Sequence, residues 1–174
     1  MKRINYLKAG FAMAMTIYGM ICARDVTASR FLDRVDLVAH EAGHLLLGWS
    51  GWEFLMVLGG TIGQLFVPVA FTIYFYLRRE RFSSAVTLFW TGQNLFNIYV
   101  YVKDAQAMVL PLVSVGGGQD TIHDWNYILT KLGLLRWDSV IGDLVYGLGV
   151  LIIAGAVIYA FYWSLEREND DLKI

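Results

Sequence analysis

Long apolar runs separated by short charged segments dominate the chain. The first apolar run covers Ala9 to Ala23, after the basic lead MKRINYLK, and Arg24 to Asp36 forms a polar link behind it. A charged start before an apolar centre also fits a signal peptide, but Ile21-Cys22-Ala23 is a poor small-residue cleavage site. We therefore predict a first membrane helix here, or a helix lying partly in the membrane interface.

The next apolar run, Val35 to Leu77, is long enough for two crossings of about 20 residues each. Its glycines cluster between Gly48 and Gly63, which is where we expect the two crossings to divide. Glycines at such a place permit a tight hairpin, a re-entrant turn or close helix contact.

Two further crossings are predicted, over Ser83 to Val102 and over Val140 to Trp163. The segment between them, Lys103 to Ser139, is irregular and contains Gly116-Gly117-Gly118. Within it, Trp125 to Trp137 is amphipathic and has Trp at both ends, which is typical of a helix at the membrane interface.

Composition supports the same class of protein. Apolar residues make up 57% of the 174 residues, charged residues make up 17% against about 25% in soluble proteins, and mean hydropathy is +0.50. We predict an all-α polytopic membrane helical bundle of about five transmembrane helices with a re-entrant or irregular segment. Residues 1–174 would form a single integral membrane domain, of which 164–174 are a charged, solvent-exposed tail.

Net charge bears on the kinds of partner expected, and cysteine content bears on disulfide bonds. The net charge is −1 and no nucleic-acid-binding motif occurs, so we expect the lipid bilayer as a partner and no nucleic acid. Cys22 is alone, which excludes an internal disulfide.

The sequence VDLVAHEAGHLLLGW, Val35 to Trp49, contains the candidate chemistry. His40 and His44 are four residues apart and project from the same face of a helix. This is the H-E-x-x-H arrangement, in which two histidines bind Zn²⁺ and the glutamate, here Glu41, acts as general base on a water. Ionisable groups in a lipid-spanning segment are expensive, which favours a functional interpretation.

A catalytic zinc ion takes a third protein ligand, which the motif does not supply. The candidates are Asp104, His123 and Asp124. His123 is the one remaining histidine, and Asp124 beside it could orient its imidazole. Alternatively, His123 is a loop residue near the N-cap of a helix beginning at Asp124. We weigh Asp104 and His123 equally as metal ligands, and both could contribute to a four-ligand site.

HEAGH in a membrane helix, followed by a polar Asn-bearing helix and then an Asp, resembles the site-2 protease family of intramembrane zinc metalloproteases. The resemblance covers Val35 to Pro111. In that family the third ligand is the Asp of an L-D-G motif, whereas Lys103-Asp104-Ala105 keeps neither the Leu nor the Gly.

HEAGH, DAQA..LPL and HDW together also look like a group of small bacterial membrane proteins related to those proteases. The resemblance implies a Zn²⁺ cofactor, a membrane protein or peptide as substrate, and the bacterial inner membrane as location.

Topology sets a condition on Asp104. If Ser83 to Val102 is a straight crossing, Asp104 leaves the membrane on the side opposite His40. Either the helix continues through AQAMVLPLV, or part of Val35 to Gly63 is re-entrant and reverses the next helix. A Lys and Arg count on the five-crossing model, eight against six, favours the side of Arg24 and Arg78 as cytoplasmic. His40 and His44 would then lie roughly 7 to 14 Å inside that end.

Gln93, Asn94 and Asn97 fall near the middle of a predicted crossing. Lipid offers amides no hydrogen-bond partners, so these side chains must find partners inside the bundle. Two roles stand open: hydrogen bonds between helices, or Asn94 and Asn97 binding the substrate backbone.

The function expected from these features is that of an intramembrane zinc metalloprotease. The alternative is a non-catalytic subunit of a larger membrane complex, with other membrane subunits as partners, which the very short soluble segments fit. Glu41 argues against that alternative, because a non-catalytic scaffold has no need of a general base. A membrane metallohydrolase acting on a substrate other than a peptide is the third possibility.

Overall fold

The computed structural model describes residues 2–110 and 123–167. The predicted all-α class is confirmed for these residues, apart from two three-residue strands that pair antiparallel, which the sequence pattern did not predict. Gly116-Gly117-Gly118 and Pro111 lie outside the described residues. In chain order the elements are β1 (Lys2–Ile4), α1 (Tyr6–Arg24), α2 (Phe31–Gly48), α3 (Glu53–Leu77), α4 (Arg81–Lys103), α5 (Asp124–Lys131), the 3-10 helix η1 (Leu135–Trp137), α6 (Asp138–Trp163) and β2 (Leu165–Arg167).

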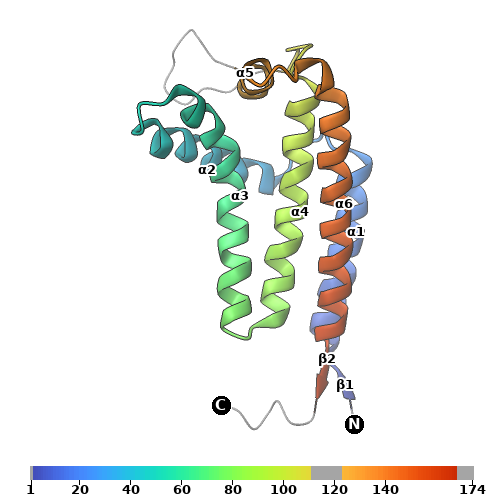
Figure 1. Ribbon diagram of the computed structural model, residues 1–174. Coiled ribbons are helices and arrows are strands. Elements are labelled where there is room, and N and C mark those ends of the chain that lie inside the picture. The colour runs from blue at the N-terminus through green and yellow to red at the C-terminus, as the bar shows by residue number, and fades with distance from the viewer. Residues whose placement is uncertain (1, 111–122, 168–174) are drawn as a thin grey trace.

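Figure 1 shows α1, α3, α4 and α6 running side by side, with α2 crosswise to them and α5 across one end. In the described part of the chain, three helical segments are long and apolar enough to cross a membrane: Tyr6–Arg24, Glu53–Leu77 and Leu135–Trp163. Their outer faces carry exposed leucines such as Leu144 and Leu151. These features are consistent with a membrane protein. The count of five crossings is not confirmed, because α2 lies crosswise and α4 is not among the apolar segments.

Helix α4 is the centre of the bundle and packs against α1, α3 and α6. Its buried side chains Phe89 and Phe96 join a core cluster with α1 and α6, and Leu95 and Ile98 join a second cluster with α5. A helix surrounded by protein can carry polar side chains that a lipid-facing helix could not. This explains why α4 is the least apolar of the four parallel helices.

Glycines allow α2 to cross α3 at very short range. A Cβ added at Gly43 would fall on the backbone carbonyl of Gly59, and a Cβ added at Gly63 would fall on the carbonyl oxygen of Ala39. Of the predicted roles for these glycines, close helix contact is therefore the one observed. The connection between the two helices lies within the predicted interval and includes Gly51 at φ +69°.

The course of α2 corrects the predicted topology. Because α2 does not run parallel to the bundle, α3 begins at the end covered by α5, and α4 returns to that end (Figure 1). Asp104, the C-cap of α4, therefore lies at the same end as α2 and not on the opposite side. The alternative of a helix continuing past Asp104 is wrong, since α4 ends at Lys103.

The grouping of basic residues on two sides is also wrong. The turn between α3 and α4, with Arg78 and Arg81 beside it, lies at the end of the bundle that carries β1 and β2. The eight-against-six count and the depth computed from it therefore no longer hold.

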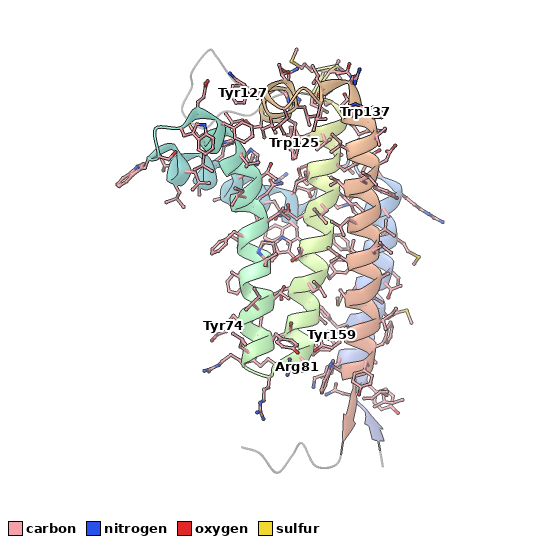
Figure 2. The ribbon with its side chains drawn as sticks, in the orientation of Figure 1. Tyr74, Arg81, Trp125, Tyr127, Trp137 and Tyr159 are labelled. Carbon is pink, nitrogen blue, oxygen red and sulfur yellow. The ribbon has the colours of Figure 1, made fainter. Side chains whose placement is uncertain are left out.

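Aromatic side chains mark both ends of the bundle. Figure 2 shows Trp125 and Trp137 at the end covered by α5, and Tyr74 and Tyr159 toward the other end, near Arg81. The Arg81 guanidinium lies 3.8 Å from the ring centroid of Tyr76. Aromatic and basic residues at two separated levels are the pattern found where a bundle meets the two membrane interfaces.

Candidate metal centre

Three side chains from two helices converge where the start of α5 meets α2. His40 and His44 stand one turn apart on α2, and Asp124 is the first residue of α5. The Nε2 atom of His40 lies 2.8 Å from Asp124 Oδ2, and the Nε2 atom of His44 lies 3.1 Å from the same oxygen. The ligand atoms of the three side chains all lie within 4.8 Å of one another, close enough to bind one metal ion.

The other ring nitrogens of both histidines are held by oxygen atoms of α3. His40 Nδ1 lies 3.0 Å from Gln64 Oε1, and His44 Nδ1 lies 2.9 Å from the backbone oxygen of Met56. A carbonyl oxygen only accepts hydrogen bonds, so each Nδ1 carries a proton and donates it. Without a metal ion, a proton on Nε2 can be donated to Asp124 Oδ2. In the neutral imidazole that a metal ion would bind, the Nε2 lone pair would instead point at the shared position, which is the tautomer that metal-ligating histidines adopt.

A glycine of α3 makes room for the two rings. A Cβ added at Gly60 would fall against Nε2 of both His40 and His44. Any larger residue would occupy the space in which the ligand atoms meet.

Electrostatics keep the third group ionised. Burial by itself raises the pKa of Asp124, but the hydrogen bonds from His40 and His44 outweigh it and hold that pKa below its ordinary value. Metal ligands must be deprotonated carboxylates and neutral imidazoles, which is the donor set that these three residues offer. Two imidazole nitrogens and a carboxylate oxygen directed at one point fit a divalent metal ion.

Asp104 and His123, the two residues favoured from the sequence as third ligand, pair with each other. His123 Nε2 lies 3.2 Å from Asp104 Oδ2, and both side chains are buried. His123 is the N-cap of α5 and accepts from the Asn126 amide through Nδ1. Neither residue belongs to the group of ligand atoms formed by the described residues. The N-cap alternative for His123 therefore matches its observed place.

Asp104 anchors the segment that follows α4. Its carboxylate accepts from the backbone amides of Val109 and Leu110, each at 3.0 Å. Burial raises the pKa of Asp104, but these two bonds and His123 outweigh that effect and bring it below its ordinary value. Together with the bond from Asn126 Nδ2 to the carbonyl of Ala105, this fixes the start of α5, and hence Asp124, which contacts the histidines of α2.

Of the remaining predicted site residues, Glu41 lies near the centre on α2, and Asn94 and Asn97 lie on α4. Glu41 is half-buried on α2, and its charge acts on His44. Asn94 is fully buried and donates to the backbone oxygen of Gln64 at 2.9 Å, which is the interhelical role weighed for it. Asn97 is partly buried on the same helix.

Comparison with family models, curated proteins and solved structures gave no match.

The sequence did not predict that Tyr101 and Gln64 lie near the metal centre. Tyr101, near the end of α4, lies close enough to Asp124, Asp104 and Glu41 to be influenced by all three charges. Its position in the run NIYVYV does not indicate that it lies near the metal centre. Gln64 did carry a signal, as a polar side chain in an apolar helix, but nothing in the sequence pairs it with His40.

Proposed function

We propose that this protein is a membrane zinc metallohydrolase of the intramembrane metalloprotease type. His40, His44 and Asp124 would hold the Zn²⁺, and Glu41 would act as general base. The observation that carries the proposal is the meeting of both Nε2 atoms at Asp124 Oδ2, while oxygen atoms of α3 hold both Nδ1 atoms.

The donor set suits zinc in a catalytic site. Catalytic zinc commonly has three protein ligands, such as two histidines and one carboxylate, and keeps a further position open. When bound, zinc would supply Lewis-acid polarisation of a carbonyl oxygen and activation of a water molecule. The hydrogen bonds to Gln64 and Met56 are the outer contacts that orient ligating imidazoles in such sites.

Glu41 is the group of this chain suited to moving the proton. It follows His40 directly on α2, is half-buried, and acts electrostatically on His44. A carboxylate there would accept the proton of the attacking water and pass it to the leaving amine. General acid–base catalysis of this kind contributes about 10²- to 10⁴-fold to the rate.

A membrane protein or peptide is the substrate we propose. The centre includes Asp124, the first residue of α5, and its neighbour Trp125 lies at the end of the bundle that α5 covers (Figure 2). A peptide would have to be locally extended there to expose its carbonyl group. Asn94 has no exposed surface to offer such a substrate, whereas Asn97, one turn further along α4, is partly exposed and stays a candidate.

The experiment compares wild type with Glu41→Gln, both purified in detergent with their zinc content measured. β-Casein, an extended polypeptide, and a co-expressed single-span membrane reporter serve as substrates. We expect Glu41→Gln to keep its zinc and to cleave at least about 100-fold more slowly. Asp143→Asn, which changes an exposed carboxylate on α6, should cleave like wild type.

Two results would count against the proposal. Cleavage by Glu41→Gln at the wild-type rate would remove the general-base assignment. Zinc-loaded wild type that cleaves neither substrate would favour the alternative, a non-catalytic subunit of a membrane complex.

A further inference from the structure

A second buried polar layer joins α2 to α4, one turn before the histidines. Trp90 Nε1 donates to Asp36 Oδ1 at 2.8 Å, and Gln93 Nε2 donates to Asp33 Oδ1 at 2.6 Å. Asp36 is 1% exposed, Gln93 2% and Asn94 0%. These three side chains are therefore closed off from solvent and lipid, whereas Asp33 and Trp90 are partly exposed.

Three oxygen atoms of this layer have no hydrogen-bond partner. They are Asp36 Oδ2, Gln93 Oε1 and Asn94 Oδ1. Asn94 lies close to the Asp36 carboxyl group, and Gln93 precedes it on α4. Amide and carboxylate oxygens only accept hydrogen bonds, so these three cannot satisfy one another. Buried acceptors without a donor are rare in native proteins and call for an explanation.

The amide groups cannot be turned over to remove the problem. Reversing the Gln93 amide would set its oxygen against Asp33 Oδ1, where its nitrogen now donates. Reversing the Asn94 amide would set its oxygen against the carbonyl oxygen of Gln64. The existing hydrogen bonds therefore fix both amide oxygens in their places.

Burial raises the pKa of Asp36 to about 7, although Trp90 and Asn94 act to lower it, so above that pH the layer carries a negative charge that needs a matching cation. Among the ion pairs of the described residues, none joins Asp36 to a Lys or Arg side chain. The guanidinium of Arg30, on the preceding turn, donates instead to the carbonyls of Ala28 and Asp25. A buried carboxylate without a counter-charge is costly, so a positive species is expected beside it.

We propose that this layer binds a monovalent metal cation of the Na⁺ class, with Asp36 Oδ2, Gln93 Oε1 and Asn94 Oδ1 among its ligands. Hard oxygen ligands suit such ions, and amide and carboxylate oxygens are all hard. Asp36 is the fully buried carboxylate of the layer, whereas Asp33 is partly exposed. A single buried carboxylate matches a single positive charge, whereas Ca²⁺ sites usually gather several carboxylates.

Two other occupants explain less. A proton on Asp36 could bridge to Asn94 Oδ1, but it would leave Gln93 Oε1 without a partner. A water molecule would donate to two of the oxygens but would leave the charge of Asp36 unbalanced.

The cation site adjoins the histidine centre through one short path. Asn94 Nδ2 donates to the backbone oxygen of Gln64, and the side chain of Gln64 meets His40 Nδ1. The cation would therefore stiffen the contact between α4 and the helix that orients His40. The two proposals are independent, because none of the three oxygen ligands belongs to the zinc centre.

The test measures thermal unfolding of the full-length protein in detergent, at fixed pH and zinc, in NaCl and in choline chloride of equal ionic strength. We expect a saturable rise of Tm with Na⁺, of about 3 °C or more well above the dissociation constant. Asp36→Asn, which keeps the shape of the side chain, should lose the rise. Asp143→Asn should keep it, because Asp143 is exposed.

Equal Tm values of wild type in the two salts would overturn the proposal without recourse to any variant. A full Na⁺ response in Asp36→Asn would overturn it as well, and equilibrium dialysis with ²²Na⁺ gives a second measurement on the same proteins. Tm values that rise on acidification and are equal in both salts would assign the layer to a proton. His44→Ala, which disables the zinc centre, should keep the Na⁺ response, so failure of one proposal is distinguishable from failure of the other.

Discussion

Gly60 offers the sharpest test of the space at the centre, through the substitution Gly60→Ala. This glycine lies on α3 against the rings of His40 and His44. The added Cβ would stand 2.6 Å from His44 Nε2 and would also contact the ring of His40. Alanine has a higher helix propensity than glycine, so the substitution by itself stabilises α3. Any loss of metal affinity would therefore come from the contact of the new Cβ with the histidine rings.

The expected size of the loss follows from the displacement. Ordinary contacts of a Cβ lie at 3.4–4 Å, so the His44 ring must move by about 0.8 Å. Metal ligands must be held within about 0.5 Å of the productive geometry. Disturbing the support of a ligating histidine typically costs about 10- to 100-fold in metal affinity, or about 1.4 to 2.8 kcal/mol.

The assay is competition for Zn²⁺ between the purified protein and a chromophoric chelator, with helix content and Tm recorded on the same samples. Gly155→Ala on α6 is the matched control, because a Cβ there meets nothing within 4 Å. We expect Gly60→Ala to be folded and to bind Zn²⁺ at least about 10-fold more weakly than Gly155→Ala. Equal affinities for Zn²⁺ in the two variants would refute the account of the centre.

Three further changes test the surroundings of the centre. Gln64→Leu removes the acceptor of His40 Nδ1 and should weaken Zn²⁺ binding by about 10- to 100-fold in the same competition assay; unchanged affinity would show that this bond orients nothing. Gly43→Ala places a Cβ against the backbone of α3 and should lower the free energy of unfolding by about 1–3 kcal/mol in thermal melts. Gly10→Ala is the control, because a Cβ there meets nothing within 4 Å and should leave the stability unchanged. Equal stabilities of the two variants would disprove the close crossing of α2 and α3. The pKa of Asp104 is held below its ordinary value of 3.8, so its carboxylate stabilises the fold above that pH, and this contribution is lost as the pH falls through the folded-state pKa. In zinc-free protein, Tm should therefore fall more steeply below about pH 4 in wild type than in Asp104→Asn. Parallel curves of Tm against pH would contradict this role of Asp104.

The spacing of the motif was sufficient to predict that His40 and His44 share a face, since that depends only on helix geometry. The third member of the cluster was not predictable in the same way. The residue types and motifs along the chain favour Asp104 and His123 over Asp124 as ligands. They pair with each other because α5 begins at Asp124 and uses His123 as its cap, a contact between segments 19 residues apart.

The course of α2 was the main feature that hydropathy could not determine. Its apolar run, considered alone, is compatible with a membrane crossing. Whether such a helix crosses or lies against its neighbours depends on contacts between helices, here the close approach of Gly43 to Gly59. That one difference moved Asp104 to the end of the bundle that holds His40, which the five-crossing model had placed on the opposite side.

For the polar residues of α4, the need of buried amides for hydrogen-bond partners predicted their contacts better than the apolar pattern did. The demand that amides inside a membrane protein find partners led to the expectation of interhelical hydrogen bonds. The amide nitrogen of Asn94 finds its partner on α3, and the amide nitrogen of Gln93 finds its partner on α2.

The central claim is that His40, His44 and Asp124 together hold one zinc ion, and metal content measures it most directly. Wild type, Asp124→Ala and His123→Asn would be purified in detergent, loaded with Zn²⁺, washed, and measured by mass spectrometry. Asn is a good helix N-cap, so His123→Asn keeps the start of α5. We predict about one zinc ion per chain in wild type and in His123→Asn, and a large loss in Asp124→Ala. Zinc retained in full by Asp124→Ala, or absent from wild type, would contradict the account.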